Sequence, residues 1–274
     1  MFASPRPSGY NTAMRIDIHT HAFHNKIADK AVGHLVDHYG ITPVGTGKAD
    51  DLIARLDRAG LDKAVVLAAA TSPRQVVPAN DWAIELKKTA PRFIPFGTLH
   101  PGYDRNAEEL ERLAENGIRG LKFHPDFQGF RMDDPAFYDL MELVDERFIC
   151  MFHVGDDLPP ALNPSCPMKM AALRRAFPRP VMIAAHMGGL KQWEYAMEHL
   201  AGLDVYVDCS SVMDFVDDDL LKRLVDAFTP DRILFGSDYP LYDAGEEIRR
   251  ITERLGLSEE RVDAFLNRAG KLFA

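Results

Sequence analysis

Two histidines separated by one residue follow a short apolar segment near the start of the chain. Residues 15–24 read Arg-Ile-Asp-Ile-His-Thr-His-Ala-Phe-His, which places the pair at His19 and His21. In a β-strand, side chains at positions i and i+2 point to the same face, about 6.6 Å apart along the chain. Both imidazoles can therefore converge beyond the end of a strand, where two neutral rings suit a divalent metal ion. The alternative is a pair of unrelated histidines at the end of a strand.

Further side chains that could serve a metal site stand directly after apolar segments later in the chain. They are His100, His124, His153, His186 and Asp238. Several imidazoles and one carboxylate can hold a divalent ion and leave a position open for water or substrate, as in metal-dependent hydrolases. The predicted ligands are nitrogens of His19, His21 and His153 and an oxygen of Asp238. His186 is the predicted proton-transfer group, because an imidazole can accept and donate a proton near neutrality. Asp238 could also act as a base.

These side chains need elements that bring them together. Segments rich in apolar residues alternate with segments of helical periodicity along the chain. The first expected strand ends in the pair His19 and His21. Further strands are expected at residues 63–70, 93–99, 118–123, 148–152, 181–185, 205–208 and 232–235. Helices are expected near residues 25–39, 50–59, 78–90, 106–116, 134–146, 168–177, 190–200, 218–228, 244–255 and 258–266.

Eight strand–helix units in about 260 residues match a (β/α)₈ TIM barrel, an α/β fold that we predict as one domain over residues 14–274. In such a barrel the carboxyl ends of all strands form one face, where the histidines and Asp238 would meet. The alternative is an open doubly wound sheet, but no Gly-x-Gly-x-x-Gly follows the first strand. Residues 1–13 carry Ser, Pro, Gly and Asn, and we expect a flexible N-terminal extension there.

The composition excludes several classes of protein. A formal net charge of −9 argues against a general binder of nucleic acid or anionic membranes, which would carry a basic face. Cys150, Cys166 and Cys209 are odd in number and far apart, which is typical of reduced thiols in a cytoplasmic protein. No apolar run reaches the roughly 20 residues that cross a bilayer. We therefore expect a cytoplasmic protein that binds a small molecule, with no nucleic acid or membrane partner.

Several motifs together resemble one known family. They are Ile-Asp-Ile-His-Thr-His (16–21), Gly-Leu-Lys-Phe-His-Pro (120–125), His-Val-Gly (153–155), Ala-His-Met-Gly-Gly (185–189) and Leu-Phe-Gly-Ser-Asp-Tyr-Pro (234–240). They resemble the amidohydrolase-related family, a branch of the amidohydrolase superfamily that includes aminocarboxymuconate-semialdehyde decarboxylase and many uncharacterised metal-dependent hydrolases. The resemblance runs from Arg15 to the C-terminus. It implies the same four metal ligands, with His186 as a catalytic acid/base or a ligand to a second ion. It also implies zinc as the favoured ion, manganese next, and one ion rather than two.

The fourth strand offers two side chains on one face, Lys122 and His124. Lys122 could be carboxylated and bridge two ions, bind a substrate carboxylate, or pair with Asp238 or Asp17 inside the barrel. We favour an uncarboxylated lysine, because the resemblance is closer to the one-metal branch. His124 would then line the pocket and contact substrate or metal. Arg131, in the loop after this strand, could hold an anionic substrate or could simply be solvated.

The favoured reaction is hydrolysis of an ester, lactone or amide bond in a small carboxylate-bearing molecule, through metal-activated water. The alternative is non-oxidative decarboxylation of an aromatic or dienoic carboxylate, in which His186 would move the proton. The same ligands serve both reactions, so the ligand set does not separate them. A non-catalytic barrel is disfavoured because none of the five metal or catalytic positions has been lost. Homodimers are common among relatives, which makes a homodimer a candidate assembly.

Overall fold

Each of the eight expected strand segments forms a strand. A computed structural model describes residues 14–144 and 146–273, and the predicted extension over residues 1–13 lies outside these residues. The strands are β1 (Ile16–Thr20), β2 (Lys63–Val66), β3 (Phe93–Pro95), β4 (Gly120–Phe123), β5 (Ile149–Phe152), β6 (Val181–Ala184), β7 (Tyr206–Asp208) and β8 (Ile233–Leu234). Most of their side chains are buried, as parallel strands covered on both faces require.

The strands close into a barrel. All strand pairs are parallel, with β1 to β3 in one ladder and β4 to β8 in a second ladder, each in chain order. Gly97, beyond β3, bridges to Leu121, and its N–H donates to the Gly120 oxygen over 2.8 Å. Thr20 bridges to Tyr239, beyond β8, and joins the other two edges. The prediction of a (β/α)₈ barrel is therefore confirmed.

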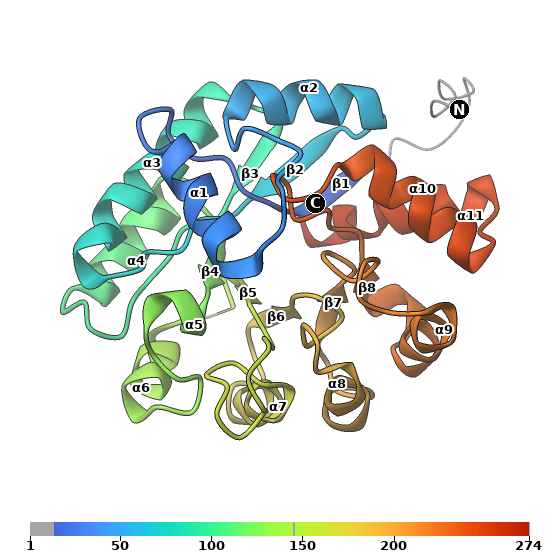
Figure 1. The fold of residues 1–274 in the computed structure, drawn as a ribbon. Helices are drawn as coiled ribbons and strands as arrows, with labels where there is room; N and C mark the ends of the chain where they lie inside the picture. Colours follow the sequence, from blue (N-terminus) through green and yellow to red (C-terminus); the bar gives the residue numbers. More distant parts are fainter. Residues whose placement is uncertain (1–13, 145, 274) are drawn as a thin grey trace.

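Helices surround the strands (Figure 1). They are α1 (Ala28–Tyr39), α2 (Ala49–Ala59), α3 (Val76–Thr89), α4 (Asn106–Glu115), α5 (Pro125–Gln128), α6 (Pro135–Leu143), α7 (Pro167–Ala176), α8 (Trp193–His199), α9 (Asp218–Ala227), α10 (Ala244–Leu255) and α11 (Glu259–Asn267). Short 3₁₀ turns lie at Pro73–Gln75, Pro230–Arg232 and Arg268–Leu272. Figure 1 shows α1 inside the ring that the other helices form around the strands. Among the helices of the described residues, none has the length and apolar character needed to cross a membrane.

Several helices begin or end up to three residues from the expected bounds, as α1 and α6 do, and two of the differences lie shortly after strands. The short helix α5 was not expected, and it begins directly after His124 at the end of β4. We expected a helix from residue 190, but α8 begins at Trp193. The reason is that the Leu190 N–H donates to the Val154 oxygen over 2.8 Å, while Lys191 adopts a left-handed φ of 58°. These contacts hold the segment after β6 as an ordered turn against the segment that follows β5.

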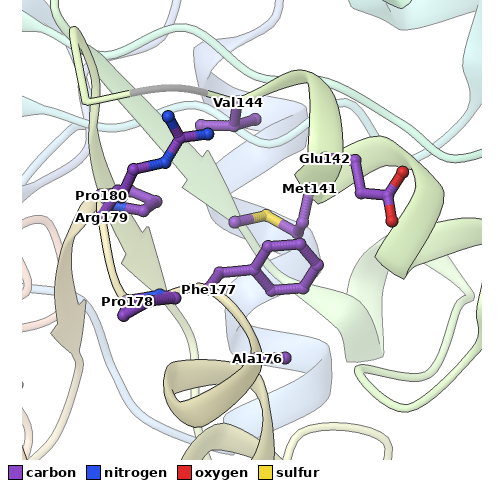
Figure 2. Close-up of a pocket in the computed structure, with 8 residues that line it drawn as sticks. All are labelled: Met141, Glu142, Val144, Ala176, Phe177, Pro178, Arg179 and Pro180. Atoms are coloured by element: carbon purple, nitrogen blue, oxygen red, sulfur yellow. The ribbon is translucent and has the colours of Figure 1, made fainter.

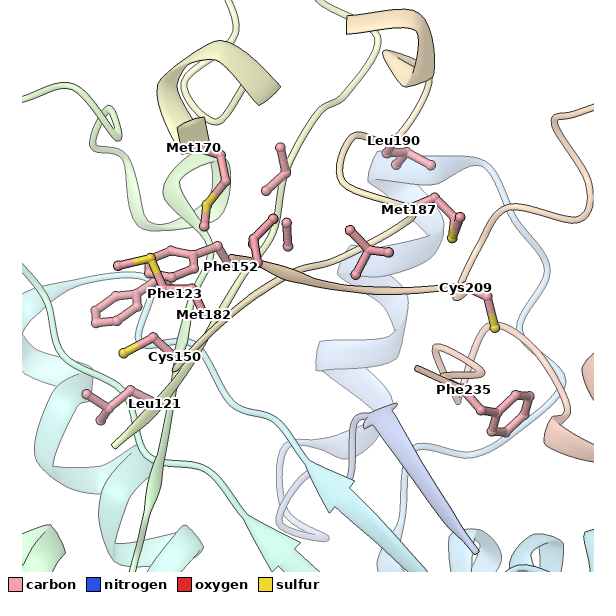
Figure 3. Packing of buried hydrophobic residues seen from close by; sticks show 14 of the residues in the cluster. Leu121, Phe123, Cys150, Phe152, Met170, Met182, Met187, Leu190, Cys209 and Phe235 are labelled. Carbon is pink, nitrogen blue, oxygen red and sulfur yellow. The ribbon is translucent and has the colours of Figure 1, made fainter. Parts of the chain in front are cut away.

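Apolar side chains form two cores. The outer core fills the space between strands and helices, and Figure 3 shows part of it around Phe123, Phe152 and Met182. The Phe123 and Phe152 rings stack with centroids 5.4 Å apart. The inner core fills the barrel, and it consists of Ile16, Ile18, Val65, Leu67, Phe96, Ile149, Met151, Ile183, Leu234 and Ala269. The barrel interior is thus packed below the strand ends, and polar chemistry is confined to the mouth.

One buried carboxyl group in α10 gives the fold a testable pH dependence. Burial raises the pKa of Glu247 from 4.5 to about 7, although Arg250 lies 3.0 Å away and opposes the shift. The folded state therefore holds this proton more tightly than the unfolded state does. The resulting stabilisation is complete below pH 4.5 and is lost as the pH rises through 7.

Relative to a Glu247→Gln variant, the wild-type free energy of unfolding should therefore fall by roughly 3 kcal/mol between about pH 4 and pH 8. Urea unfolding of both proteins at several pH values measures this difference. Glu246→Gln is the matched control, because Glu246 is exposed on the same helix. A difference between wild type and Glu247→Gln that does not change with pH would contradict the expectation.

Candidate metal centre

The first strand carries its histidine pair to the barrel mouth through an irregular pairing. Ile16 and Ile18 pack in the inner core, so strict alternation would turn His19 away from the interior. The register between β1 and β2 shifts just after Asp17. Such an irregularity re-aims the side chains that follow it. As a result the His19 and His21 rings lie close together, with centroids 5.4 Å apart.

His19 is held in one tautomer by a buried carboxylate on β7. Its Nδ1–H donates to Asp208 Oδ2 over 3.0 Å, and Ser210 Oγ lies 3.0 Å from the same nitrogen. Burial and the nearby Lys122 ammonium lower the pKa of His19 to about 4, so the ring is neutral at pH 7. Burial opposes ionisation of Asp208, but its contacts with His19 and Ser210 outweigh burial and hold its pKa below the usual range. The Nε2 lone pair of His19 therefore remains available to a ligand.

His21 and Asp238 face each other at the mouth. His21 Nδ1 donates to the Leu67 oxygen over 3.1 Å, which leaves Nε2 unprotonated in the neutral ring. Asp238 Oδ1 lies 3.4 Å from His21 Nε2 and 3.5 Å from His19 Nε2. Its second oxygen accepts a hydrogen bond from Ser211 Oγ over 2.5 Å.

His153 and His186 form a second pair of rings. His153 Nε2 donates to the Gly155 oxygen over 2.9 Å, and His186 Nδ1 donates to the Ser210 oxygen over 3.1 Å. The two remaining nitrogens, His153 Nδ1 and His186 Nε2, face each other at 3.1 Å. In neutral rings both of these atoms carry lone pairs, so a proton or a metal ion is needed between or beside them.

The polar atoms fit a divalent cation. The ligand atoms of His19, His21 and Asp238 lie within 4.8 Å of one another, and the same is true of those of His19, His186 and Asp208. Each imidazole donates its other nitrogen to a carbonyl or carboxylate, which is the outer-shell support that metal-ligating histidines have. Imidazole nitrogens with one carboxylate oxygen suit zinc or a neighbouring transition metal.

Of the four predicted ligands, three thus lie within one such group. The fourth, His153, groups instead with His124 and Asp126, and it reaches the others through its contact with His186. The ring centroids of His19 and His186 are 5.0 Å apart, and those of His153 and His186 are 4.9 Å apart. The four ligands therefore belong to one connected cluster, and their joint binding of an ion stays a prediction.

Lys122 lies below this cluster inside the barrel. Its Nζ is 3.5 Å from His19 Nε2, and the residue is only 1% exposed. Burial lowers its pKa to about 8, while Asp208 and Asp238 act in the opposite direction. The amine is therefore mostly protonated at pH 7 and could attract a substrate carboxylate. This role stays a prediction.

His124 is buried beside the cluster but presents a different atom. Its Nδ1 accepts the Phe127 N–H over 3.3 Å, so Nε2 carries the proton in the neutral ring. Burial and Lys122 lower the pKa of His124 well below its usual value, which keeps the ring neutral. The ring stacks on His153 with centroids 3.9 Å apart. A protonated Nε2 suits a hydrogen bond to substrate better than coordination of a metal.

Most residues with a strained backbone lie in or next to this cluster. Among the described residues other than glycine, those with positive φ are His186, Met187, Lys191, Ser211 and Asp238. Only Lys191 lies outside the cluster and its immediate chain neighbours. Each such conformation costs about 1–3 kcal/mol and persists only where surrounding contacts determine it. The chain thus gives up stability to hold these side chains, as functional sites commonly do.

Arg131 contacts residues outside the cluster. Its Nε is 3.1 Å from Asp133 Oδ1, its Nη1 donates to the Leu162 oxygen over 3.3 Å, and its side chain is 40% exposed. Contact with an anionic substrate would require this guanidinium to leave Asp133. The expected role in substrate binding stays a prediction.

Sequence reasoning missed four side chains of the site. They are Asp208, Ser210, Ser211 and Tyr39, the last lying 3.4 Å from His124 Nε2 through its hydroxyl. A signal for the first three was present, because Asp208 ends the seventh expected strand and the two serines follow within three residues. No comparable signal marked Tyr39, which lies in a helix more than 80 residues before His124 in the chain.

A small cavity lies elsewhere on the barrel. It has a volume of about 160 Å³ and is lined by Met141, Glu142, Val144, Ala176, Phe177, Pro178, Arg179 and Pro180 (Figure 2). These residues precede β5 and β6, so the cavity opens at the amino ends of the strands. None of the clustered histidines lines it.

The fold and this cluster are those of a (β/α)₈ enzyme with a metal-type site at the carboxyl ends of its strands. A family model described as Amidohydrolase matches residues 16–273. The chain therefore belongs to the amidohydrolase family, which confirms the resemblance found in its motifs. No curated protein matches the sequence.

Solved structures share the fold at low sequence identity. An uncharacterised TIM-barrel protein from Bordetella bronchiseptica has a TM-score of 0.71 and 16% identity, covering 94% of this chain and 97% of that chain. A 5-carboxyvanillate decarboxylase from Novosphingobium aromaticivorans, solved with manganese and 3-methoxy-4-hydroxy-5-nitrobenzoic acid, has a TM-score of 0.66 and 18% identity, covering 96% and 97%. A 2,6-dihydroxybenzoate decarboxylase from Rhizobium has a TM-score of 0.65 and 17% identity, covering 96% and 100%.

Proposed function

We propose that this protein is a metal-dependent decarboxylase that removes carbon dioxide, without oxidation, from a small aromatic or dienoic carboxylate. The observation that carries the proposal is the position of His186 Nε2, which points at the ligand cluster while Nδ1 is held by the Ser210 oxygen. The decarboxylases among the structures with this fold support this reaction better than they support hydrolysis, the reaction favoured by the motifs.

The proposed cofactor is one divalent ion, held by His19 Nε2, His21 Nε2, His153 Nδ1 and Asp238 Oδ1. When bound, such an ion would supply positive charge that attracts and orients the substrate carboxylate. Zinc and manganese are the candidates, and the manganese in the Novosphingobium decarboxylase supports the second. The protonated Lys122 beside His19 would add to the attraction for an anionic substrate.

The chain's own groups supply the proton chemistry. Decarboxylation breaks the bond between the carboxylate carbon and its neighbour, carbon dioxide leaves, and the electron pair stays on the neighbouring carbon. That carbon must then receive one proton. We assign its delivery to His186, which would carry the proton on Nε2, and the contact of Nδ1 with the Ser210 oxygen, which fixes the ring, supports this role. His124 would line the substrate pocket beside it, with its Nε2–H donating to the Tyr39 oxygen.

Product analysis on a panel of hydroxy- and methoxybenzoates and dienoic acids tests the proposal. We expect release of carbon dioxide and a product that has lost the carboxylate and gained one hydrogen, with deuterium incorporated from heavy water at that carbon. A chelator or the Asp238→Asn variant should abolish release. Products of water addition from an ester, lactone or amide panel, without carbon dioxide release from any carboxylate, would overturn decarboxylation in favour of hydrolysis.

A further inference from the structure

One phenol at the barrel mouth has a hydrogen atom that no group of the described residues accepts. Tyr39 is the last residue of α1, which lies inside the ring of outer helices in Figure 1. Its oxygen lies 3.4 Å from His124 Nε2. Because Phe127 occupies His124 Nδ1, Nε2 is the protonated nitrogen and donates to the phenol oxygen. The O–H hydrogen of Tyr39 is therefore left without an acceptor within residues 14–144 and 146–273.

The phenol is held in place from several sides. His38, the residue before it, donates from Nε2 to Asp156 Oδ2 over 3.0 Å and so ties the end of α1 to the loop after β5. The Phe127 ring packs against both His38 and Tyr39, with centroids 4.8 and 5.9 Å away. Gly40, at a left-handed φ of 66°, ends the helix directly afterwards. A donor fixed in this way loses little freedom when it binds a ligand.

The surroundings of Tyr39 define the acceptor it suits. Its partner His124 stacks on the predicted ligand His153. The His124 ring therefore lies between the phenol and the predicted metal centre. Burial and the negative charges of Asp238, Asp156 and Asp126 raise the pKa of Tyr39 well above its usual value, so the group is a neutral donor. The same three carboxylates would repel an anionic oxygen at this position. A neutral oxygen, such as a hydroxyl or methoxy group, is the acceptor that fits.

We propose that Tyr39 is a specificity residue that donates a hydrogen bond to a neutral oxygen substituent of the substrate, separate from the carboxylate that leaves. This inference rests on the proposed decarboxylation. Removal of one neutral hydrogen bond to a ligand corresponds to about a tenfold loss of binding. The effect should be confined to substrates that carry the substituent.

The test uses pairs of hydroxybenzoates that differ by one additional hydroxyl or methoxy group. Wild-type protein, Tyr39→Phe and the control Tyr195→Phe are compared by kcat/KM on both members of each pair. Tyr195 is a suitable control because it is exposed on α8 and, of the rings that the structure describes, stacks on His199 alone. We expect wild type and control to prefer the substituted member of one pair by about tenfold. Tyr39→Phe should lose that preference through a raised KM and should handle the unsubstituted member within about twofold of wild type.

Two outcomes overturn the inference alone. The first is a Tyr39→Phe variant that keeps the wild-type preference. The second is a variant that loses activity equally on both members, which indicates a structural role for the phenol. In both cases carbon dioxide is still released by the wild type, and the proposed reaction stands. If the metal-loaded wild type releases no carbon dioxide from any carboxylate, the proposed function fails and the specificity role of Tyr39 fails with it.

Discussion

Replacing His186 with asparagine should lower kcat by about two to four orders of magnitude, while the affinity for metal stays within a few-fold of wild type. The physical reason is that His186 Nε2 is the proposed donor of the proton to the substrate carbon, and an amide cannot deliver one. Asparagine is the suitable replacement because His186 adopts a φ of 59°, a left-handed conformation that asparagine tolerates. Its amide can also donate to the Ser210 oxygen in place of Nδ1.

The His186→Asn effect is measured by steady-state carbon dioxide release and by manganese titration on the same preparations. His199→Asn is the matched control, because His199 is partly exposed at the end of α8 and contacts Glu198 and Tyr195, which lie outside the predicted site. Turnover by His186→Asn at the wild-type rate, with an unchanged dependence on pH, would exclude His186 as the proton donor. A variant that loses manganese binding outright would instead identify His186 as a metal ligand.

Replacing Asp208 with asparagine should weaken metal binding by about 10- to 100-fold, although Asp208 is not among the predicted ligands. One oxygen of Asp208 accepts from His19 Nδ1, and the other accepts from the backbone N–H groups of His186 and Ser210. An asparagine has only one oxygen, so its amide must face donors on one side or the other. The His19 ring then loses the hydrogen bond that fixes its tautomer, or the segment carrying His186 loses its anchor.

Dissociation constants for manganese, measured by titration of metal-free protein, test the role of Asp208. Asp204→Asn is the control, because Asp204 lies just before β7 and pairs at the surface with Arg232. Circular dichroism and thermal unfolding of the metal-free proteins separate weakened binding from lost folding. A folded Asp208→Asn variant with the wild-type dissociation constant would show that orientation of His19 does not depend on this carboxylate.

The barrel and the location of its site could be predicted because both depend on local patterns. Continuous apolar segments such as residues 148–152 are typical of strands covered on both faces, and eight of them alternate with helices. The carboxyl ends of parallel strands in a barrel form one face. A histidine that directly follows a strand, such as His153 or His186, is therefore expected on that face. The start of α8 could not be predicted, because it depends on contacts with the segment after β5, which is distant in the sequence.

The finer structure of the site depends on barrel closure and was not predictable. The register shift after Asp17 that turns His19 toward the mouth arises from pairing with β2. The hydrogen bond between His19 and Asp208 joins residues 189 positions apart, and the periodicity of a sequence does not indicate such a contact. Arg131 is a candidate only because it follows a strand, and its guanidinium pairs with nearby Asp133, so its role in binding stays a prediction.

Anomalous X-ray scattering from crystals grown with manganese tests most directly whether these scattered side chains meet around one cation. We expect a single strong peak at the barrel mouth, within about 2.0–2.4 Å of His19 Nε2, His21 Nε2, His153 Nδ1 and Asp238 Oδ1. A peak bound only by His124, Asp126 and His153, or no peak at the mouth with manganese present, would contradict the proposed metal centre.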